Sequence, residues 1–479
     1  MEDRTIPLVV DLDGTLVTTD TLFENAMALI RGNPWLAARI LVWAFRGKPV
    51  LKSEIARRVT VDVGHLPWRL ELIEYLRAEK SAGRQLVLAT AAHRSTAEAV
   101  AAHLELFDEV LSSDSLVNLK GVAKRDALVR RFGERGFDYI GDSRSDVPIW
   151  AVSRIAHLAG SARTLPGSVM ERGAQRGKVF SSPPANLRVW LRSLRAHQWV
   201  KNVLVFAPAV LSHRFIVETL PPLMLAFVGF SLIASATYAT NDLFDLDADR
   251  RHSGKRSRPL ASGELSIGHG VILAVLLTAA GFGVGIMTSG ALSVCLAAYM
   301  CVALAYSAFL KNKPVIDVVT LALLYTLRIF AGGAVGRVRI SNWLFQFSIF
   351  FFLSLAFVKR YSELRRLRKT KHRKAPGRGY RPRDLGIISQ AGVGSGLLAG
   401  LVLALYVNGE DVQRLYPRPY MLWGVCPLFL YWMTRVWLIA HRGNMHEDPI
   451  LYAFRDRVSY IVGGLILVLA ILGALPNAH

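Results

Sequence analysis

A run of acidic residues follows an uncharged apolar stretch near the middle of the chain. Residues 241–249 read Asn-Asp-Leu-Phe-Asp-Leu-Asp-Ala-Asp. On a helix, Asp242, Asp245 and Asp249 would share one face, whereas Asp247 would point to the opposite side. Carboxylates at a membrane boundary are costly unless a cation binds them. Three convergent carboxylates suit Mg²⁺ that carries the phosphates of a substrate, so the motif indicates diphosphate chemistry at a membrane surface.

A second set of chemical groups lies in the N-terminal part, close to the ends of predicted elements. Apolar strands over 6–10, 85–89 and 138–141 are each followed by polar residues, and an amphipathic helix begins at Lys124. The carboxyl ends of parallel strands meet at one edge of a sheet. The residues expected at that edge are Asp11, Asp13, Thr90, Lys124, Asp142 and Asp146.

These groups suit the hydrolysis of a phosphate ester. Asp11 can attack phosphorus and form an aspartyl phosphate. Asp13 can protonate the leaving oxygen and later activate water. Lys124 and Thr90 can neutralise and hydrogen-bond the phosphoryl oxygens. The residues expected to hold Mg²⁺ are Asp11, Asp13 through its carbonyl group, Asp142 and Asp146.

The composition separates this chain from soluble globular proteins. It has 479 residues, 52% of them hydrophobic, and 58 Lys and Arg against 36 Asp and Glu give a net charge of +22. In so apolar a chain this excess indicates cytoplasmic loops and contact with anionic lipids, and no nucleic-acid partner is expected. The three cysteines lie in apolar runs, so neither a disulfide framework nor a zinc site is expected. The start of the chain has no signal-peptide pattern, which predicts a cytoplasmic N-terminal part.

The polarity of the chain changes near residue 180, where Ser181-Ser-Pro-Pro184 is typical of a linker. Residues 1–180 alternate short apolar runs with amphipathic stretches, which predicts an α/β domain. Residues 181–479 contain apolar runs of membrane-spanning length, which predicts an all-α polytopic membrane domain. The first of nine predicted spans is the weakest, because it is short and contains Pro208. The predicted spans are 199–215, 220–241, 268–288, 290–310, 314–335, 342–359, 385–408, 418–440 and 458–476.

The basic residues predict the orientation of these spans. The loops after the even-numbered spans contain 22 Lys and Arg, against five in the loops on the other side. The positive-inside rule therefore places the acidic motif on the cytoplasmic face of the membrane, which we expect to be a bacterial inner membrane. The run 359–383 holds twelve of these basic residues. It is interpreted as an orientation signal with lipid contact, and phosphate binding by its first residues is the alternative.

The N-terminal motifs resemble those of the haloacid dehalogenase superfamily over residues 5–160. The resemblance is carried by Asp11-x-Asp13-Gly-Thr on a strand, then Thr90, Lys124 and Gly141-Asp142-x-x-x-Asp146. It implies a Rossmann-like phosphatase domain over residues 1–180 with a small helical cap at about 18–80. Lys120 is an alternative to Lys124, and a purely structural domain is an alternative to an enzyme.

One segment of this cap is apolar but too short to span a membrane. It covers residues 35–45 and reads Trp-Leu-Ala-Ala-Arg-Ile-Leu-Val-Trp-Ala-Phe. Packing inside the cap is one interpretation. The other is contact with the membrane, where the cap would accept a lipid-linked substrate.

The second half resembles the UbiA superfamily of intramembrane prenyltransferases over residues 187–476. The resemblance is carried by Asn241-Asp-x-x-Asp-x-x-x-Asp249, Lys255-Arg-x-Arg-Pro-Leu-Ala-Ser-Gly263 and Tyr306-Ser-x-x-Leu-Lys311. Most of that superfamily has a second Asp-rich motif after the sixth span, which binds a prenyl diphosphate with a second Mg²⁺. This chain instead has Lys359-Arg-Tyr-Ser-Glu363, with one acid among bases. Bases there suit direct capture of an anionic phosphate.

Further segments resemble the decaprenyl-phosphate phosphoribosyltransferase branch of the superfamily. They are residues 198–202, 327–333, 359–363 and 455–458. The resemblance implies transfer of 5-phosphoribose from phosphoribosyl diphosphate to polyprenyl (decaprenyl) phosphate. Asp242, Asp245 and Asp249 would then be catalytic, because they would hold Mg²⁺ on the leaving diphosphate.

Basic and polar residues of these motifs are the expected substrate contacts. They are Lys201, Asn202, Asn241, Lys255, Arg256, Arg258, Tyr306, Lys311, Arg328, Lys359, Arg360, Tyr361, Glu363 and Asp456. Those expected at the ribose donor are Lys201, Lys255, Arg256 and Arg258, and those expected at the lipid phosphate are Lys359 and Arg360. Arg328 lies inside a span, where a charge indicates a functional site, and a structural pair with Asp317 is the alternative.

The two resemblances together predict a bifunctional membrane enzyme with one Mg²⁺ in each active site. The phosphatase would remove the 5-phosphate and give polyprenyl-phosphoryl ribose for arabinofuranose donors, and tethering would raise the effective concentration of the intermediate. The expected partners are phosphoribosyl diphosphate, polyprenyl phosphate and membrane lipids, with a possible homo-oligomer. One alternative is an aromatic prenyltransferase that uses a prenyl diphosphate donor, with a phosphatase of unrelated substrate. The other is a non-catalytic membrane scaffold.

Overall fold

The chain forms two compact units. The computed structural model describes residues 5–33, 35–59, 62–114, 118–160, 164–165, 167–181, 186–213, 217–252, 254–369, 379–445 and 448–476. The first unit joins Met1–Leu194 to Tyr238–Ala274, and the second joins Arg195–Thr237 to Val275–His479. The limits of these units differ from the single domain boundary predicted near residue 180. The reason is that the loop after the acidic motif packs with N-terminal residues. Residues 182–185 of the predicted linker region lie outside the described residues.

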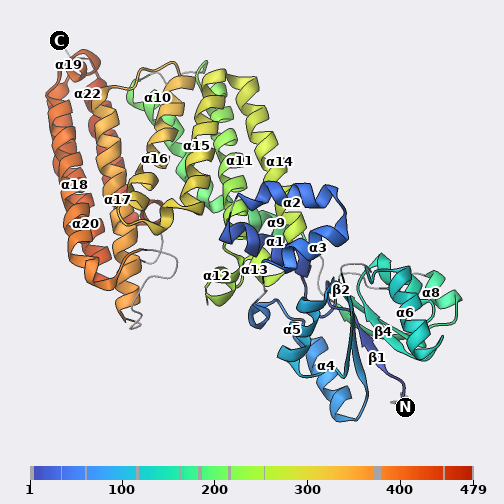
Figure 1. The fold of residues 1–479 in the computed structure, drawn as a ribbon. Coiled ribbons are helices and arrows are strands. Elements are labelled where there is room, and N and C mark those ends of the chain that lie inside the picture. Colours follow the sequence, from blue (N-terminus) through green and yellow to red (C-terminus); the bar gives the residue numbers. More distant parts are fainter. Residues whose placement is uncertain are drawn as a thin grey trace. The chain divides into compact units, whose positions relative to one another are not determined.

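The first unit is built on a parallel sheet of six strands in the order β3-β2-β1-β4-β5-β6 (Figure 1). The strands are β1 (Leu8–Val10), β2 (Leu86–His93), β3 (Glu109–Ser113), β4 (Asp138–Gly141), β5 (Ile155–Gly160) and β6 (Gln175–Ser181). Val10 pairs with Leu88 on one side and with Ile140 on the other. This register brings the residues near the ends of β1, β2 and β4 to one edge, as the sequence predicts.

Helices cover both faces of this sheet, because successive residues of a buried strand point to opposite sides. Leu8 and Val10 belong to the core on one face, and Val9 belongs to the core on the other. The helices of the first face are α4 (Leu70–Ser81) and α5 (Arg94–Leu104). Those of the second face are α6 (Val122–Phe132), α7 (Val147–Trp150) and α8 (Gly167–Glu171). The prediction of a Rossmann-like α/β domain is confirmed.

A small helical cap follows β1. Its helices are α1 (Thr21–Gly32), α2 (Leu36–Phe45) and α3 (Lys48–Ala56). They share a core of Ala26, Leu29, Trp43 and Ile55. The cap is shorter than the predicted 18–80, because α4 packs against the sheet through Leu72 and Leu76.

A buried charge network fixes the start of β4. The Arg84 side chain is fully buried, and it pairs with Glu79 at 2.9 Å and with Asp138. Arg154 reaches the same Asp138 carboxylate at 2.7 Å, and its side chain is 20% exposed. Removing one partner of a buried pair leaves an unpaired charge in the interior, which is strongly destabilising.

We expect Arg84→Ala to lower the free energy of unfolding of the N-terminal domain by about 3–5 kcal/mol, since Glu79 and Asp138 lose a shared cation. Arg154→Ala is the matched control. It should cost only about 1–2 kcal/mol, because Asp138 keeps Arg84 and water reaches this side. Pulse proteolysis of the purified full-length protein in increasing urea measures both losses. Equal losses in the two variants would contradict the central role of Arg84.

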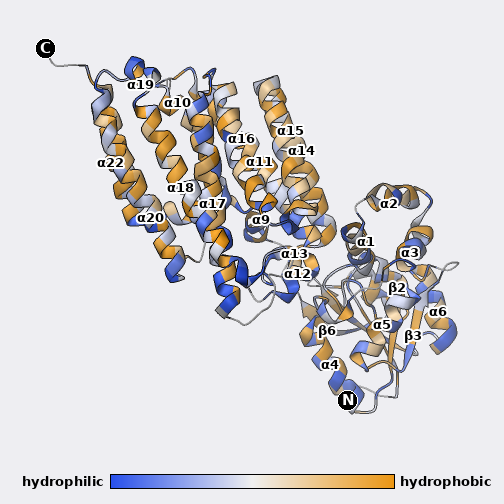
Figure 2. Ribbon diagram, turned by 60° about the vertical axis from the view of Figure 1, so that its left-hand side comes forward, coloured by the Kyte–Doolittle hydropathy of each residue, from blue (hydrophilic) through white to orange (hydrophobic). Residues whose placement is uncertain are grey.

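Eight helices in the described part of the chain are long and apolar enough to cross a membrane. They are α11 (Leu220–Phe244), α14 (Ile267–Thr288), α15 (Gly290–Ala308), α16 (Ile316–Val335), α17 (Asn342–Lys369), α18 (Leu385–Val407), α20 (Val425–Arg442) and α22 (Arg457–Ala474). Figure 2 shows hydrophobic residues along these helices. They confirm the predicted all-α polytopic domain and eight of its nine spans.

The first predicted span, 199–215, is wrong as a regular helix. The chain forms a 3₁₀ helix, η3 (Ala196–Phe206), then the short α10 (Ala207–Leu211), and residues 214–216 lie outside the described residues. Pro208 lies in the first turn of α10, where its missing N–H costs nothing. The segment is not among the eight helices of the described residues that are long and apolar enough to cross a membrane.

The connection between α11 and α14 lies in the first unit and contains α12 (Leu246–Arg251) and α13 (Pro259–Ser262). The short α9 (Leu187–Leu194) lies beside it through Val189, which shares a core with Leu243 and Leu260. The second unit contains two further short helices, α19 (Glu410–Leu415) and α21 (Pro449–Ala453).

Candidate functional sites

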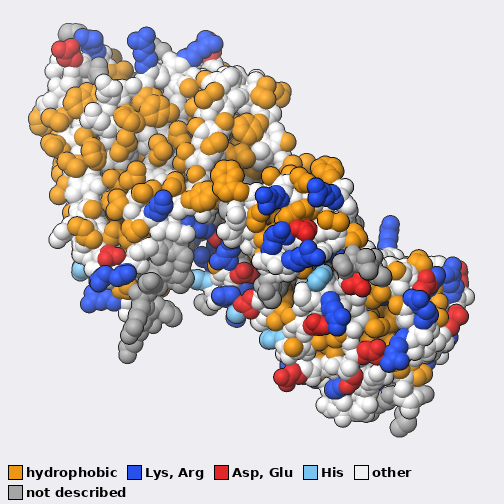
Figure 3. Space-filling view, in the orientation of Figure 1, with side chains coloured by type: hydrophobic (Ala, Val, Ile, Leu, Met, Phe, Trp, Pro, Cys, Tyr) orange, Lys and Arg blue, Asp and Glu red, His pale blue; other side chains and the backbone are white. Residues whose placement is uncertain are grey.

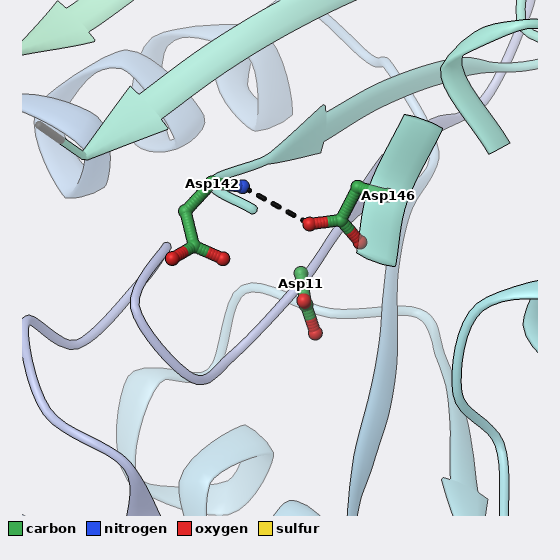
Figure 4. Close-up of side chains that lie close together, drawn as sticks. All are labelled: Asp11, Asp142 and Asp146. Carbon is green, nitrogen blue, oxygen red and sulfur yellow. Dashed lines mark hydrogen bonds between the residues drawn. The ribbon is translucent and has the colours of Figure 1, made fainter. Parts of the chain in front are cut away.

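Three carboxylates meet at the predicted edge of the sheet. Asp11 follows β1, Asp142 follows β4, and Asp146 ends the short turn Arg144–Asp146. One oxygen of each lies within 4.8 Å of the others, and Figure 4 shows the three side chains side by side. The Asp146 carboxylate accepts the backbone N–H of Asp142 at 3.2 Å and that of Ser143 at 3.1 Å. These bonds anchor Asp146 and so fix the loop after β4.

Lys124 lies where the sequence places it. Its ammonium group, buried on α6, is 2.8 Å from Asp11 Oδ1 and donates to the Tyr139 hydroxyl at 3.1 Å. Tyr139 in turn donates to Asp146 at 2.8 Å. Lys120, the alternative lysine, is exposed to solvent. The contacts therefore favour Lys124 for binding phosphoryl oxygens.

The charges of this cluster fit a divalent cation. Burial raises the pKa of Asp11, and Lys124 only partly offsets this effect. Burial, with Asp11 and Asp146 close by, raises the pKa of Asp142 to about 8. Crowded carboxylates resist ionisation until a cation neutralises them, and a hard divalent ion with oxygen ligands does so. Asp11, Asp142 and Asp146 are therefore a suitable donor set for Mg²⁺.

Asp13 has the properties of a proton donor. Burial, then the nearby Asp20, raise the pKa of Asp13 to about 7. The first backbone N–H of α1, from Thr21, donates to Asp13 Oδ1 at 2.7 Å and orients the carboxyl group. Gly14 has φ +74, and a Cβ there would lie 2.1 Å from Asp142 Oδ2, so the tight turn after Asp13 requires glycine.

Two residues near this site were missed by sequence reasoning. Tyr139 lies inside β4 and connects Lys124 to Asp146, but a tyrosine in a buried strand has no sequence signal for such a role. Lys52 of α3 donates to the Ala91 carbonyl at 2.5 Å and to Asn118 at 3.1 Å. Ala91 directly follows the predicted site residue Thr90, so the cap reaches the site through Lys52.

The acidic motif lies at the junction of α11 and α12. The helix is interrupted at Asp245, which is the N-cap of α12, so the expected single helix is wrong in detail. Asp242 and Asp249 still lie close to each other: one guanidinium group, that of Arg258, donates to Asp242 Oδ1 at 3.1 Å and also to Asp249. Asp247 points away and pairs with Arg31 of the cap at 3.3 Å, as the spacing predicts.

One oxygen of the Asp249 carboxylate accepts no hydrogen bond from the described residues. This oxygen is Oδ1, and the side chain is almost fully buried. The Lys255 ammonium group is 3.8 Å away from this oxygen. Arg256 is exposed, and Asn241 and Asp245 are partly buried. A buried carboxylate oxygen that accepts no hydrogen bond from the described residues fits a motif that binds a metal ion.

Two lysines of the second unit meet at one carboxylate. Lys201 of η3 and Lys359 of α17 each donate to Asp448 Oδ2 at 2.9 Å. Burial would raise the pKa of Asp448, but the two ammonium groups outweigh it and hold the pKa well below its usual range. Asp448 was missed by sequence reasoning, although an Asp directly before Pro449 is typical of a helix N-cap.

Arg328 is buried inside α16 without a carboxylate partner among the described residues. It donates to Asn202 at 2.8 Å and to the Tyr299 hydroxyl at 3.0 Å, and it also bonds the Leu324 carbonyl. Its guanidinium lies 4.6 Å from the centre of the Tyr299 ring. The alternative pair with Asp317 is wrong. A buried cation in a membrane domain without a counter-ion favours an anionic ligand.

Asp317 instead belongs to a polar cluster around Arg360. Arg360 bonds to Asp317 and donates to Glu363 at 2.6 Å and to the Tyr306 hydroxyl at 2.8 Å. Tyr380 donates to the other Asp317 oxygen at 2.5 Å. The structure thus brings three predicted site residues, Tyr306, Arg360 and Glu363, into one network that stabilises the helix packing.

The remaining predicted contacts lie apart from these clusters. The Tyr361 hydroxyl lies 3.0 Å from His441 Nδ1. Asp456 is the N-cap of α22 and pairs with Arg435 at 2.6 Å. Lys311 lies in a short turn at Leu310–Asn312 and is partly buried.

Comparison with known proteins identifies both halves of the chain. Residues 203–455 match the UbiA prenyltransferase family. The chain belongs to the UbiA prenyltransferase family. Residues 8–150 match the haloacid dehalogenase-like hydrolase family, so a UbiA domain is fused to an N-terminal haloacid dehalogenase-like domain.

Three bacterial proteins show how far the similarity extends along this UbiA protein. The uncharacterised protein y4nM of Sinorhizobium fredii is 36% identical over 97% of this chain and 90% of its own length. The nodulation protein NoeC of Azorhizobium caulinodans is 35% identical over 59% of this chain and 92% of its own length. The decaprenyl-phosphate phosphoribosyltransferase of Corynebacterium glutamicum is 38% identical over 38% of this chain and 57% of its own length.

Proposed function

We propose that this protein transfers 5-phosphoribose from phosphoribosyl diphosphate to a polyprenyl phosphate, and that its N-terminal domain then removes the 5-phosphate. The Lys201–Asp448–Lys359 cluster carries this proposal. Two ammonium groups meet in this cluster. A site that binds a prenyl diphosphate through a second metal ion would instead need several carboxylates there. The similarity to decaprenyl-phosphate phosphoribosyltransferases supports the same reaction.

The transfer requires one anionic acceptor and one activated leaving group. Asp242, Asp245 and Asp249 are proposed to bind the Mg²⁺ form of the leaving diphosphate, and the metal ion would supply charge neutralisation of that group. An oxygen of the lipid phosphate attacks the ribose carbon, and the bond from that carbon to diphosphate breaks. The attacking phosphate is already ionised, so no strong general base is needed.

The basic residues have separate proposed roles. Lys359 holds the lipid phosphate, and Lys201, expected from the sequence at the ribose donor, joins it there because the two ammonium groups meet at Asp448. Arg258, now bonded to Asp242 and Asp249, would be free to bind the diphosphate if a cation occupied its position between the two carboxylates. Arg328 provides further positive charge for an anion within the membrane domain.

The proposed phosphatase reaction follows from the sheet-edge cluster. An Asp11 oxygen attacks the phosphorus of the 5-phosphate, and the bond from phosphorus to the ribose oxygen breaks. Asp13, whose pKa is raised to about 7, donates the proton to that oxygen. Lys124 neutralises the phosphoryl oxygens. Asp13 then accepts a proton from the water that hydrolyses the aspartyl phosphate.

One experiment tests the proposal directly. Purified protein in detergent with Mg²⁺ receives polyprenyl phosphate and phosphoribosyl diphosphate, and mass spectrometry identifies the lipid products. We expect polyprenyl-phosphoryl ribose, with its 5-phosphorylated form as an early intermediate. A parallel reaction receives a prenyl diphosphate and 4-hydroxybenzoate. A prenylated aromatic product there, without any ribosylated lipid, would overturn the proposal in favour of an aromatic prenyltransferase.

A further inference from the structure

Helix α2 of the cap exposes a large apolar surface. Trp35, directly before the helix, is 84% exposed, Leu41 is 63% exposed, and Phe45 is 93% exposed. Val42 is 50% exposed. Residues three, four and seven positions apart lie on the same side of a helix, so these side chains form one continuous stripe. An exposed apolar patch of this kind marks an interaction site.

The exposed stripe is separate from the side of α2 that packs in the cap core. The opposite side of α2 already provides Leu36, Ile40 and Trp43 to the cap core. Trp43 is 7% exposed, in contrast to its neighbours on the stripe. Packing inside the cap therefore accounts for one side of α2 and leaves the other side exposed.

Basic residues accompany the stripe. Arg39 and Arg46 are exposed, and residues 35–50 contain no Asp or Glu. Figure 3 shows hydrophobic side chains together with Lys and Arg over the part of the molecule that α1–α3 occupy. Apolar side chains flanked by arginines, without acids, are typical of a helix that lies in the surface of an anionic bilayer.

The cap is attached to the ends of two membrane-spanning helices within the first unit. Glu24 of α1 binds Arg250 of α12 through two hydrogen bonds, of 2.6 and 3.0 Å, and both side chains are buried. Met27 of α1 packs in a cluster with Leu243 at the end of α11 and Ile267 at the start of α14.

A second close contact fixes the base of the cap. Gly263 has φ +78, and a Cβ there would lie 2.0 Å from Thr18 Oγ1. Thr18 lies just before α1, so the chain enters the cap directly against the loop between two spans. On α14, Ile272 is already 55% exposed and begins the side of that helix suited to lipid. The cap is thus attached next to the exposed apolar side of a helix that is long and apolar enough to cross a membrane.

We propose that α2 lies in the membrane interface, with Trp35, Leu41 and Phe45 among the acyl chains and Arg39 and Arg46 at anionic headgroups. The occupant of the stripe is therefore the lipid bilayer. A second part of the proposal rests on the proposed function: the cap receives the phosphorylated lipid product at this interface. Lys52 on the neighbouring α3 donates to the carbonyl of Ala91 in β2, next to the predicted site residue Thr90, which connects the interface to that site.

Spin labels test the location of the stripe without any assumption about activity. Cys295, Cys301 and Cys426 are first replaced by serine, and one cysteine is introduced at Leu41 or Phe45 for labelling. The full chain is reconstituted in vesicles of equimolar phosphatidylcholine and phosphatidylglycerol. Collision rates with oxygen and with a water-soluble nickel chelate are then measured. Ile272→Cys is the lipid-exposed control, and Ala102→Cys on the exposed side of α5 is the solvent control.

We expect labels at Leu41 and Phe45 to collide preferentially with oxygen, like the label at Ile272. Preferential collision with the nickel chelate, as at Ala102, would overturn the proposal. Protection from both reagents would also overturn it, because a protein partner or a second copy of this chain would then cover the stripe.

The second part has its own test. In the variant Leu41→Glu with Phe45→Glu, we expect hydrolysis of the 5-phosphorylated lipid in vesicles to fall about tenfold, through lost interfacial binding. Turnover of a small soluble phosphomonoester should stay unchanged, which also shows that the domain is folded. Equal activity on both substrates in variant and parent would refute delivery through the cap. If no lipid product forms even in the parent protein, the proposed function fails and the spin-label result still stands.

Discussion

Asp11→Asn should abolish dephosphorylation while transfer of phosphoribose continues. The amide cannot act as a nucleophile, and it removes the carboxylate that Lys124 binds at 2.8 Å. Loss of a catalytic nucleophile typically lowers turnover by about 10⁴-fold or more. The product of the variant should therefore be polyprenyl-phosphoryl ribose that still carries its 5-phosphate. Mass spectrometry of the lipid products measures the ratio of the two forms.

Asp126→Asn is the control for this change. Asp126 lies on α6 near Lys124 in sequence, but its side chain is 49% exposed, and Arg125 is its ion-pair partner among the described residues. An exposed ion pair contributes little to stability, so the ratio of the two lipid products in Asp126→Asn should match that of the parent protein. Normal dephosphorylation by Asp11→Asn would refute the assigned nucleophile. Unchanged total transfer in both variants is required for the interpretation that the two sites act in sequence.

Asp249→Asn should lower transferase turnover by about 10³-fold, because the proposed cation loses one negative ligand at the developing diphosphate charge. Asp249 is the acid of the motif with a buried oxygen that accepts no hydrogen bond from the described residues. The residual reaction should also need more Mg²⁺. A titration of initial rate against Mg²⁺ concentration, at saturating phosphoribosyl diphosphate, measures both effects.

Asp247→Asn is the matched control, since it makes the same chemical change two residues away. Asp247 pairs with Arg31, and the two side chains are 36% and 47% exposed. We expect nearly normal turnover and an unchanged Mg²⁺ requirement. Equal losses in Asp247→Asn and Asp249→Asn would mean that the motif acts through its total charge and not through a defined face.

Local pattern predicted most of the fold. Parallel strands bring their ends to one edge, which predicted that Asp11 and Asp142 would lie together, and their carboxylates do meet that of Asp146. Eight spans followed from length and polarity alone. The first span failed, because the 3₁₀ geometry of η3 depends on packing and has no distinct hydrophobic period.

The sequence by itself determined which residue types could bind metal and phosphate, since those types recur at short, regular spacings. Only the tertiary structure decided which charges meet. Lys201 and Lys359 share Asp448, Arg250 binds Glu24 of the cap, and Asp317 pairs with Arg360 and not with Arg328. The partners in each of these contacts are separated by between 43 and 247 residues along the chain. Helical and strand periods constrain only near neighbours, so the choice among distant partners depends on how the helices pack.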